Sequence, residues 1–419
     1  MVRPRDRRRR RPEALAALGG RQRRRTVLRH PLPDRSRPDA LLRQGQPGRG
    51  PRPRVAGNGR ADAVLRASTR QARRLTGSHS GAATPSLSYV VPTIGASEHL
   101  AKCLASIYRD GGGLDAPSEL VIVWQAPVTE DAGGPAALRE LCRRLASARP
   151  GAIDDPPRIV ELPRPAGFAR AINDGITISG GDWVALVNDD VVLEAGWARR
   201  LLEAAEAGSR VAAAQGINVM ASGEGDGEDA RVDGAGLAWN RRWQAVQSGR
   251  GETVEEVEAV RRVYGVSATA AIYRRSALVD VNVAGNVLRP FEERLDSYYE
   301  DVELADRLRG AGYRALLVPP ARAVHAGALS SRSPRAARRR TRRVYANRLL
   351  VLARRLGRGF WLRLPVLLAR DAFDAVGRPK TTAMPGDLEP PGIVDLARAW
   401  GRTARLLPRF GHFGPGTPR

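Results

Sequence analysis

The sequence predicts an α/β protein with a mostly parallel sheet flanked by helices. Short runs rich in β-branched and aromatic residues alternate with amphipathic segments of helical length. This alternation is typical of parallel strands joined by right-handed helical crossovers. The predicted strands cover residues 88–93, 120–124, 158–162, 183–187 and 315–320, and the predicted helices cover residues 100–108, 136–148, 167–178 and 300–310.

Each element follows from its own pattern. The first strand ends in a Pro-Thr turn, and the second, Leu-Val-Ile-Val-Trp, is apolar throughout, as expected for a strand buried on both faces. The fourth runs directly into Asn188, which marks its end. In the last helix Leu304 and Leu308 share one face, and Gly310 or Gly312 ends it.

Charge divides the 419 residues into a body with two basic arms. The net charge is +25, but residues 85–330 carry 26 basic and 34 acidic side chains. Residues 1–84 carry 23 arginines and 5 acids, and residues 331–370 carry 13 arginines and no acid. Charge therefore divides the chain into a central domain at 85–330 and a basic helical extension at 331–419. An argument for nucleic-acid binding from charge applies only to the arms.

The first 84 residues are rich in Arg, Pro and Gly and are predicted to be disordered, because they cannot bury enough apolar surface. Two interpretations stay open: an arm for anionic surfaces or nucleic acid, or a start-site artefact of a GC-rich reading frame. The segment has no apolar core of a secretory signal. No run of 18 apolar residues predicts a membrane span. Cys103 and Cys142 are expected to be buried thiols, and a cytoplasmic location follows.

Polar residues follow three of the predicted strands. Pro92 and Thr93 end the first and Gln125 ends the second, while the run Asn188-Asp189-Asp190 follows the fourth. Because ligands of parallel sheets bind beyond the carboxyl ends of the strands, these side chains are expected to share one site. Carboxylate oxygens suit Mg²⁺ or Mn²⁺, and a nucleotide diphosphate can share that ion.

Two further segments carry side chains that could act as a general base or as a metal ligand. Glu300 and Asp301 begin the helix at 300–310, where the helix dipole favours an ionised carboxylate that could act as a general base. Simple N-capping is the alternative. His325 follows the strand at 315–320 and is either a structural histidine or a further metal ligand.

Four stretches, in order, resemble the inverting family 2 glycosyltransferases of GT-A (Rossmann-like) fold, of the bacterial rhamnosyltransferase-like type. They are Val-Val-Pro-Thr at 90–93, Pro-Ala-Gly-Phe-Ala-Arg-Ala-Ile-Asn-Asp-Gly at 165–175, Asn-Asp-Asp at 188–190 and Tyr-Glu-Asp-Val-Glu-Leu at 299–304. The last continues as Arg-Leu-Arg-x-Ala-Gly-Tyr and leads to His325. The segment at 265–278 is similar too, so the resemblance covers about residues 87–350.

The resemblance implies a role for each matching residue. Asp190 would bind the cation with help from His325, and Asp301 would be the general base, with Glu300 beside it. The donor nucleotide would be held by Pro92, Thr93, Gln125, Arg170, Asn173, Asn188 and Asp189. The enzyme would transfer one sugar from a dTDP- or UDP-linked donor to a cell-envelope glycan or polyprenyl-linked acceptor.

Two departures from the family pattern matter. Gln125 stands where the family often has an aspartate for the nucleobase, which leaves the base open. The Gln-x-x-Arg-Trp motif of processive synthases is missing after the Glu-Asp motif, because Arg241-Arg242-Trp243 precedes it. Transfer of a single sugar is therefore expected, without polymerisation.

In the C-terminal arm, arginine clusters alternate with Leu349-Leu350-Val351-Leu352 and with Phe360-Trp361 over residues 335–370. This pattern predicts either an interfacial helix on an anionic membrane or a helix that packs on the core.

Other function classes stay open as alternatives. A nucleic-acid- or anionic-surface-binding protein would act through its Arg-rich arms, an inactive GT-A scaffold would lack turnover, and a nucleotidyl- or phosphoglycosyl-transferase would use the same sheet edge.

Overall fold

The computed structural model describes residues 86–95, 97–111, 113–114, 117–126, 134–149, 153–221, 230–257, 259–327, 334–376 and 391–410. All of these residues belong to one compact unit, Asn58–Arg419. The segment predicted to be disordered, residues 1–84, lies outside the described residues.

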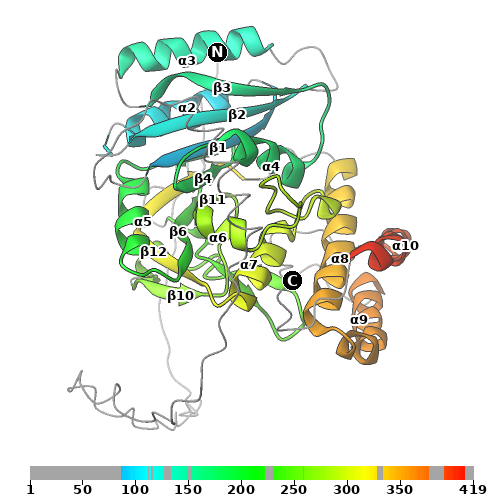
Figure 1. The fold of residues 1–419 in the computed structure, drawn as a ribbon. Coiled ribbons are helices and arrows are strands. Elements are labelled where there is room, and N and C mark those ends of the chain that lie inside the picture. The colour runs from blue at the N-terminus through cyan, green and yellow to red at the C-terminus, as the bar shows by residue number, and fades with distance from the viewer. Residues whose placement is uncertain are drawn as a thin grey trace, which may run out of the picture. The chain divides into compact units, whose positions relative to one another are not determined.

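The predicted α/β class is confirmed, because a large sheet lies between helices (Figure 1). Ten of the described strands form this sheet, with the order β10-β12-β6-β11-β4-β1-β2-β3, while β5 pairs with β12 and β7 with β6. The strands β3, β2, β1 and β4 are parallel, whereas β11 runs antiparallel to both β4 and β6. The sheet strands are β1 Leu87–Ile94, β2 Ser118–Gln125, β3 Asp154–Leu162, β4 Trp183–Val187, β5 Val191–Leu193, β6 Val211–Met220, β7 Val232–Gly234, β10 Arg261–Val263, β11 Ala270–Arg274 and β12 Arg314–His325.

Two hydrophobic cores, one on each face of the sheet, follow from the alternation of side chains along its strands. In β1, Tyr89 and Val91 pack with α2, α3 and α5, whereas Val90 packs with α4, α6 and α7. Cys103 and Cys142 are buried, as expected. The helices are α2 Glu98–Gly111, α3 Pro135–Ala148, α4 Phe168–Ile178, α5 Trp197–Glu206, α6 Arg275–Asp280 and α7 Glu300–Gly310.

The five strands predicted from apolar runs are present, but β6 was not predicted. Its sequence, Val-Ala-Ala-Ala-Gln-Gly-Ile-Asn-Val-Met, is rich in small residues and lacks a β-branched run. Small residues are needed here because β12 crosses closely: a Cβ on Gly216 would overlap the carbonyl oxygen of Ala321. The predicted strand at 315–320 also continues to His325, past a register irregularity between Leu317 and Arg322.

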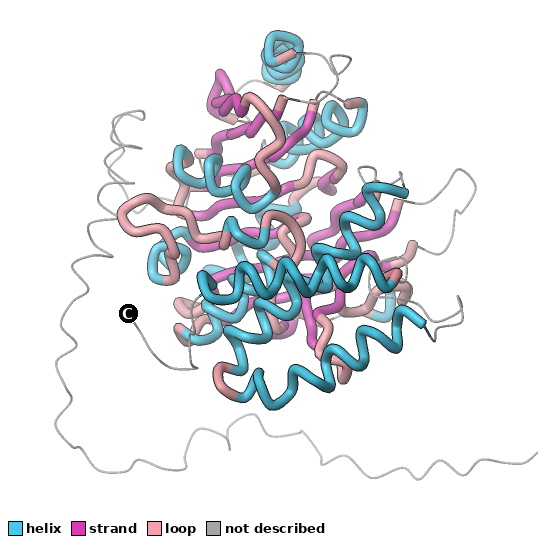
Figure 2. The backbone as a smooth tube through the Cα atoms, turned by 90° about the vertical axis from the view of Figure 1, so that its right-hand side faces the viewer, coloured by secondary structure: helices cyan, strands magenta, loops and turns pink. Residues whose placement is uncertain are grey.

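The described part of the C-terminal extension is helical, as predicted. Figure 2 shows the three helices α8 Pro334–Leu356, α9 Gly359–Val376 and α10 Ile393–Phe410 lying together in front of the sheet. In α8 the apolar run at 349–352 is buried. This half of the predicted interfacial helix therefore packs on the core. Among the described residues, no helix is long and apolar enough to cross a membrane.

The described part of the chain also forms four smaller elements. They are the hairpin strands β8 Leu237–Trp239 and β9 Ala245–Gln247, and the 3₁₀ helices η1 Val254–Glu256 and η2 Glu293–Leu295.

Candidate active site

A cavity of about 1070 Å³ opens at the carboxyl ends of β1, β2 and β4. This is the edge at which parallel sheets bind ligands. Nine residues that the sequence predicted for the site line this cavity: Pro92, Thr93, Gln125, Asn188, Asp189, Asp190, Glu300, Asp301 and His325. The sheet and α7 thus bring together side chains that lie more than 200 residues apart.

Two predicted donor-binding residues do not line the cavity, and this corrects their expected role. Arg170 is exposed on α4 and lies 3.6 Å from Asp174. Asn173 is fully buried, donating to the carbonyl of Phe291 at 2.8 Å and accepting from its backbone N–H at 3.0 Å. The matching motif at 165–175 therefore supports the loop before η2 through Asn173.

One end of the cavity carries a chain of charged groups. The Nε2 atom of His325 lies 3.4 Å from Oδ1 of Asp190, and its Nδ1 lies 2.8 Å from Oδ2 of Asp233. Asp233 also pairs with Arg250. Burial lowers the pKa of His325, but its hydrogen bonds to Asp190 and Asp233 outweigh burial and raise it to about 9. Burial raises the pKa of Asp233, yet His325 and Arg250 together bring it below its ordinary value.

The residues beside this chain are held by short contacts. The hydroxyl of Thr93 donates to Oδ2 of Asp189 at 2.6 Å, and burial, together with the charge of Asp190, raises the pKa of Asp189. The side-chain oxygen of Asn188 is buried and has no hydrogen-bond partner among the described residues. An unpaired buried carbonyl oxygen at a cavity wall is suited to accept a bond from a ligand or to coordinate a cation.

The donor set fits a divalent cation at this end. Adjacent ligands of an octahedral Mg²⁺ lie about 3 Å apart, which is close to the separation of Asp190 from His325. Among the described residues, no group of three or more His, Cys, Asp or Glu side chains is arranged to hold a metal. Mg²⁺ sites commonly combine one or two protein carboxylates with substrate phosphates and water.

Gln125 lies at the end of β2 and lines the cavity. Its Oε1 accepts a hydrogen bond from the backbone N–H of Ala166 at 2.9 Å. This bond ties the start of the 165–175 motif to the sheet.

Two carboxyl groups at the start of α7 form a second part of the cavity wall, and of these Glu300 is buried and Asp301 is half-buried. Burial and the charge of Asp301 raise the pKa of Glu300 well above its ordinary value, and its Oε2 has no hydrogen-bond partner in the described part of the chain. Burial also raises the pKa of Asp301, to about 6. Its Oδ1 accepts from the N–H of Val302 at 2.8 Å. Burial therefore outweighs the expected effect of the helix dipole, although Asp301 is still ionised at neutral pH.

A strained loop leads into α7. Asp296, Tyr298 and Tyr299 all have positive φ angles, of 67°, 71° and 73°. Side chains with a Cβ rarely adopt this conformation, and such residues concentrate at functional sites. Gly167 makes room for the loop, because it has a φ of 90° and a Cβ there would overlap the carboxylate of Asp296.

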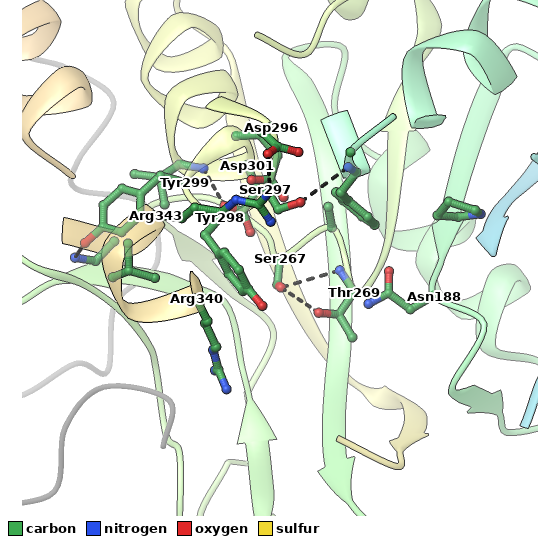
Figure 3. A pocket seen from close by; sticks show the side chains of 18 of the residues that line it. Asn188, Ser267, Thr269, Asp296, Ser297, Tyr298, Tyr299, Asp301, Arg340 and Arg343 are labelled. Atoms are coloured by element: carbon green, nitrogen blue, oxygen red, sulfur yellow. Dashed lines mark hydrogen bonds and ion pairs between the residues drawn. The ribbon is translucent and has the colours of Figure 1, made fainter. Parts of the chain in front are cut away.

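The helix α8 supports the same loop from the other side. The amide nitrogen of Asn347 lies within 3.0 Å of the carbonyl oxygens of Leu295, Ser297 and Tyr298. Arg343 forms an ion pair with Asp296. Figure 3 shows Arg340 and Arg343 on one side of the cavity and Asn188 on the other, with Asp301 between them. The C-terminal extension is therefore part of the site wall.

Sequence reasoning missed Asp233, Asp296, Asn347 and the arginines of α8 as site residues. Asp233 is in a short strand with no motif, so nothing in the sequence pointed to its contact with His325. For the α8 residues a signal existed, because the Tyr-Ala-Asn-Arg-Leu-Leu run at 345–350 resembles a helix that follows the core in the same family.

A comparison with protein-family models finds a match in the central part of the chain. The family model described as "Glycosyl transferase family 2" matches residues 88–281. That range includes the predicted nucleotide-binding residues and the Asn-Asp-Asp run, whereas α7 and His325 lie beyond it. No curated protein matches the chain.

Solved structures of glycosyltransferases are similar to the chain at low identity. GalNAc-T7 with UDP, GalNAc and Mn²⁺ is 13% identical over 70% of this chain and 52% of its own, about half its length, with a TM-score of 0.48. The mannosyltransferase PcManGT from Pyrobaculum calidifontis with GDP-Man and Mn²⁺ is 20% identical over 83% of this chain and 84% of its own, with a TM-score of 0.42. Residues 1–349 of S. aureus TarS are 14% identical over 78% of this chain and 82% of their own, with a TM-score of 0.41.

Because these TM-scores lie below 0.5, the assignment depends on the family match and on the sheet-edge site. Residues 88–281 match the model of family 2 glycosyltransferases, and the chain is a glycosyltransferase.

Proposed function

We propose that the protein transfers one sugar from a nucleotide-diphosphate donor to a hydroxyl group of a cell-envelope glycan or lipid-linked acceptor, with inversion at the anomeric carbon. One observation carries this proposal: a single cavity joins the Asp190–His325 end to the carboxyl pair Glu300–Asp301. Transfer needs both ends, since one stabilises a departing diphosphate and the other accepts a proton.

At the donor end, Thr93, Gln125 and Asn188 would contact the nucleotide. Gln125 carries both a donor and an acceptor, so it suits the edge of uracil or thymine, and the proposed donors are UDP- or dTDP-linked. Asp190 and His325 would hold Mg²⁺ or Mn²⁺, with Asp189 and Asn188 nearby. When bound, the cation neutralises the charge that develops on the diphosphate.

At the acceptor end, Asp301 would accept the proton of the attacking hydroxyl. A pKa of about 6 keeps this carboxylate ionised at neutral pH while making it a stronger base than an exposed aspartate. Burial and the charge of Asp301 raise the pKa of Glu300 well above its ordinary value, which favours the negative charge on Asp301 over Glu300. Attack from the side opposite the leaving diphosphate inverts the anomeric centre.

The proposal also covers the number of sugars transferred and the way in which a lipid-linked acceptor is reached. A single transfer per encounter is proposed, because the motif of processive synthases is missing from the sequence. A polyprenyl-linked acceptor would be reached through peripheral contact with an anionic membrane.

A donor screen with the full chain tests the proposal. Release of nucleoside diphosphate is measured for a panel of nucleotide sugars with Mn²⁺ or Mg²⁺. Slow hydrolysis of one donor is expected, and Asp190→Ala should abolish it, because the diphosphate then loses its cation. Glu203→Ala, an exposed acid on α5 outside the cavity, is the matched control and should keep the wild-type rate. If no donor is bound or hydrolysed, the proposed function is wrong.

A further inference from the structure

The helix α9 buries its acidic side chains and exposes large apolar ones. Its two acids face the protein interior, where Asp371 is 0% and Asp374 2% exposed. Asp371 pairs with Arg348 of α8 at 2.6 Å, and Asp374 pairs with Arg242 at 2.5 Å. Every negative charge of this helix is therefore neutralised on its inner face.

The outer face of α9 is apolar and open. Leu362, Phe373 and Val376 are 82%, 62% and 77% exposed, and Trp361 and Val366 are more than half exposed. Positions 362, 366, 373 and 376 recur at helical spacing, so Leu362, Val366, Phe373 and Val376 form one stripe. Single exposed apolar residues are ordinary, but a stripe of large ones along about four turns of helix indicates a surface that is covered in use.

Arginines border this stripe without any acid. The charged residues exposed on α9 and at its start are Arg358, Arg363 and Arg370. The neighbouring helix α10 continues the pattern, because Ile393 and Val394 are exposed at its start and its exposed charged residues are arginines. An apolar stripe between cations matches a helix that lies in the interface of an anionic bilayer.

Charge argues against the other possible occupants. A second copy of the same face would bring these arginines against their equivalents with no acid to pair with them. The N-terminal segment, residues 1–84, carries 23 arginines against 5 acids and would be repelled in the same way. Anionic phospholipid supplies both the apolar phase and the negative charge.

We propose that the outer face of α9, with the stripe Leu362, Val366, Phe373 and Val376 and the border Arg358, Arg363 and Arg370, docks the protein on an anionic phospholipid surface. This deepens the proposed membrane contact and rests on it. Within and just beyond the predicted 335–370 segment, it restricts the contact to the outer face of α9, because the run at 349–352 is buried. Because Arg348 lines the cavity and holds Asp371, the docking helix is tied directly to the cavity wall.

Flotation with vesicles tests this surface, using the full chain and phosphatidylcholine vesicles with or without phosphatidylglycerol. The wild-type protein should float with the anionic vesicles. Leu362→Glu/Phe373→Glu should lower the partition coefficient at least tenfold, because two charges would enter the apolar phase. The matched control Val260→Glu/Val287→Glu changes two exposed valines outside α9 and should float like wild type.

A second variant separates charge from apolar contact. Arg358→Gln/Arg363→Gln/Arg370→Gln should weaken binding to anionic vesicles on the order of a hundredfold and leave binding to neutral vesicles unchanged. Thermal unfolding and donor hydrolysis should stay at wild-type values in every α9 variant, since none of the replaced residues lines the cavity. If the wild-type protein hydrolyses no donor, this result counts against the proposed function and leaves the proposed membrane-binding surface untouched.

Three results would overturn the inference. They are a wild-type protein that does not float with anionic vesicles, an α9 variant that floats as well as wild type, and a wild-type dimer in light scattering that Leu362→Glu/Phe373→Glu converts to monomer. The last result would assign the face to a second copy of the chain.

Discussion

The two acidic ends of the cavity are built in opposite ways. At one end, Asp190 and Asp233 flank His325, and Arg250 also pairs with Asp233. At the other end, Glu300 and Asp301 lie side by side, and burial raises the pKa of both. At the first end, His325 and Arg250 together bring the pKa of Asp233 below its ordinary value. Desolvation makes the second end a better proton acceptor.

Removing the proposed base at the second end should cause the largest loss of sugar transfer. Asp301→Asn should lower sugar transfer about 10²- to 10⁴-fold, which is the usual contribution of a positioned base. Donor hydrolysis should stay within a few-fold of wild type, because the Asp190 end is intact. Transfer and nucleoside diphosphate release are measured in the same assay. A parallel loss of both activities would show that Asp301 acts on the donor instead.

The first end is tested through the partner of its histidine. Asp233→Asn should weaken Mn²⁺ binding about 10- to 100-fold, because Asp233 orients His325 toward Asp190. Titration with Mn²⁺ measures the change. Asp280→Asn, which alters an acid bonded to Tyr313 outside the cavity, is the control. Unchanged Mn²⁺ affinity in Asp233→Asn would remove His325 from the proposed cation site.

The second end depends on its strained loop, so the support of that loop is the next target. Asn347→Ala removes bonds to three carbonyl groups of the loop before α7. Transfer should fall about tenfold with hydrolysis unchanged, and stability should fall by about 1–3 kcal/mol because buried carbonyls lose their partner. Thermal unfolding and both activities are measured. If stability alone changes, Asn347 has no part in placing Asp301.

The smallest expected effect is the pH dependence of the second end. The base must be ionised to accept a proton, and a pKa of about 6 means that transfer falls as pH drops through this value. Between pH 7 and pH 5.5 the ionised fraction, and with it the transfer rate, should fall about fourfold. Rates of single-turnover transfer give the profile. A midpoint near 4 would show that Asp301 is not desolvated when substrate is bound.

Much of the fold and part of the site could be predicted from the sequence alone. The strands β1, β2, β3 and β4 are short, dense apolar runs, so local composition identifies them. Once these strands are parallel, their carboxyl ends must share one edge, which brings Thr93, Gln125 and Asp190 together. The position of Asp301 at a helix start also follows from local pattern, since α7 begins at Glu300.

Tertiary structure alone decided the features that depend on which surfaces meet. Asp233 reaches His325 only because β7 pairs with β6, and β6 lies next to β12. Asn347 supports the loop before α7 through contacts about 50 residues away in the chain.

The basic arm is the clearest case. The arginine-rich helix α8 packs on the core through its apolar run at 349–352, whereas the more apolar helix α9 exposes a stripe of large apolar side chains. Composition sets which residues are available, but the buried Arg348 and the half-exposed Arg242 hold Asp371 and Asp374 on the inner face of α9. An unpaired buried charge is too costly to persist, so these pairs determine which face of α9 is left outside.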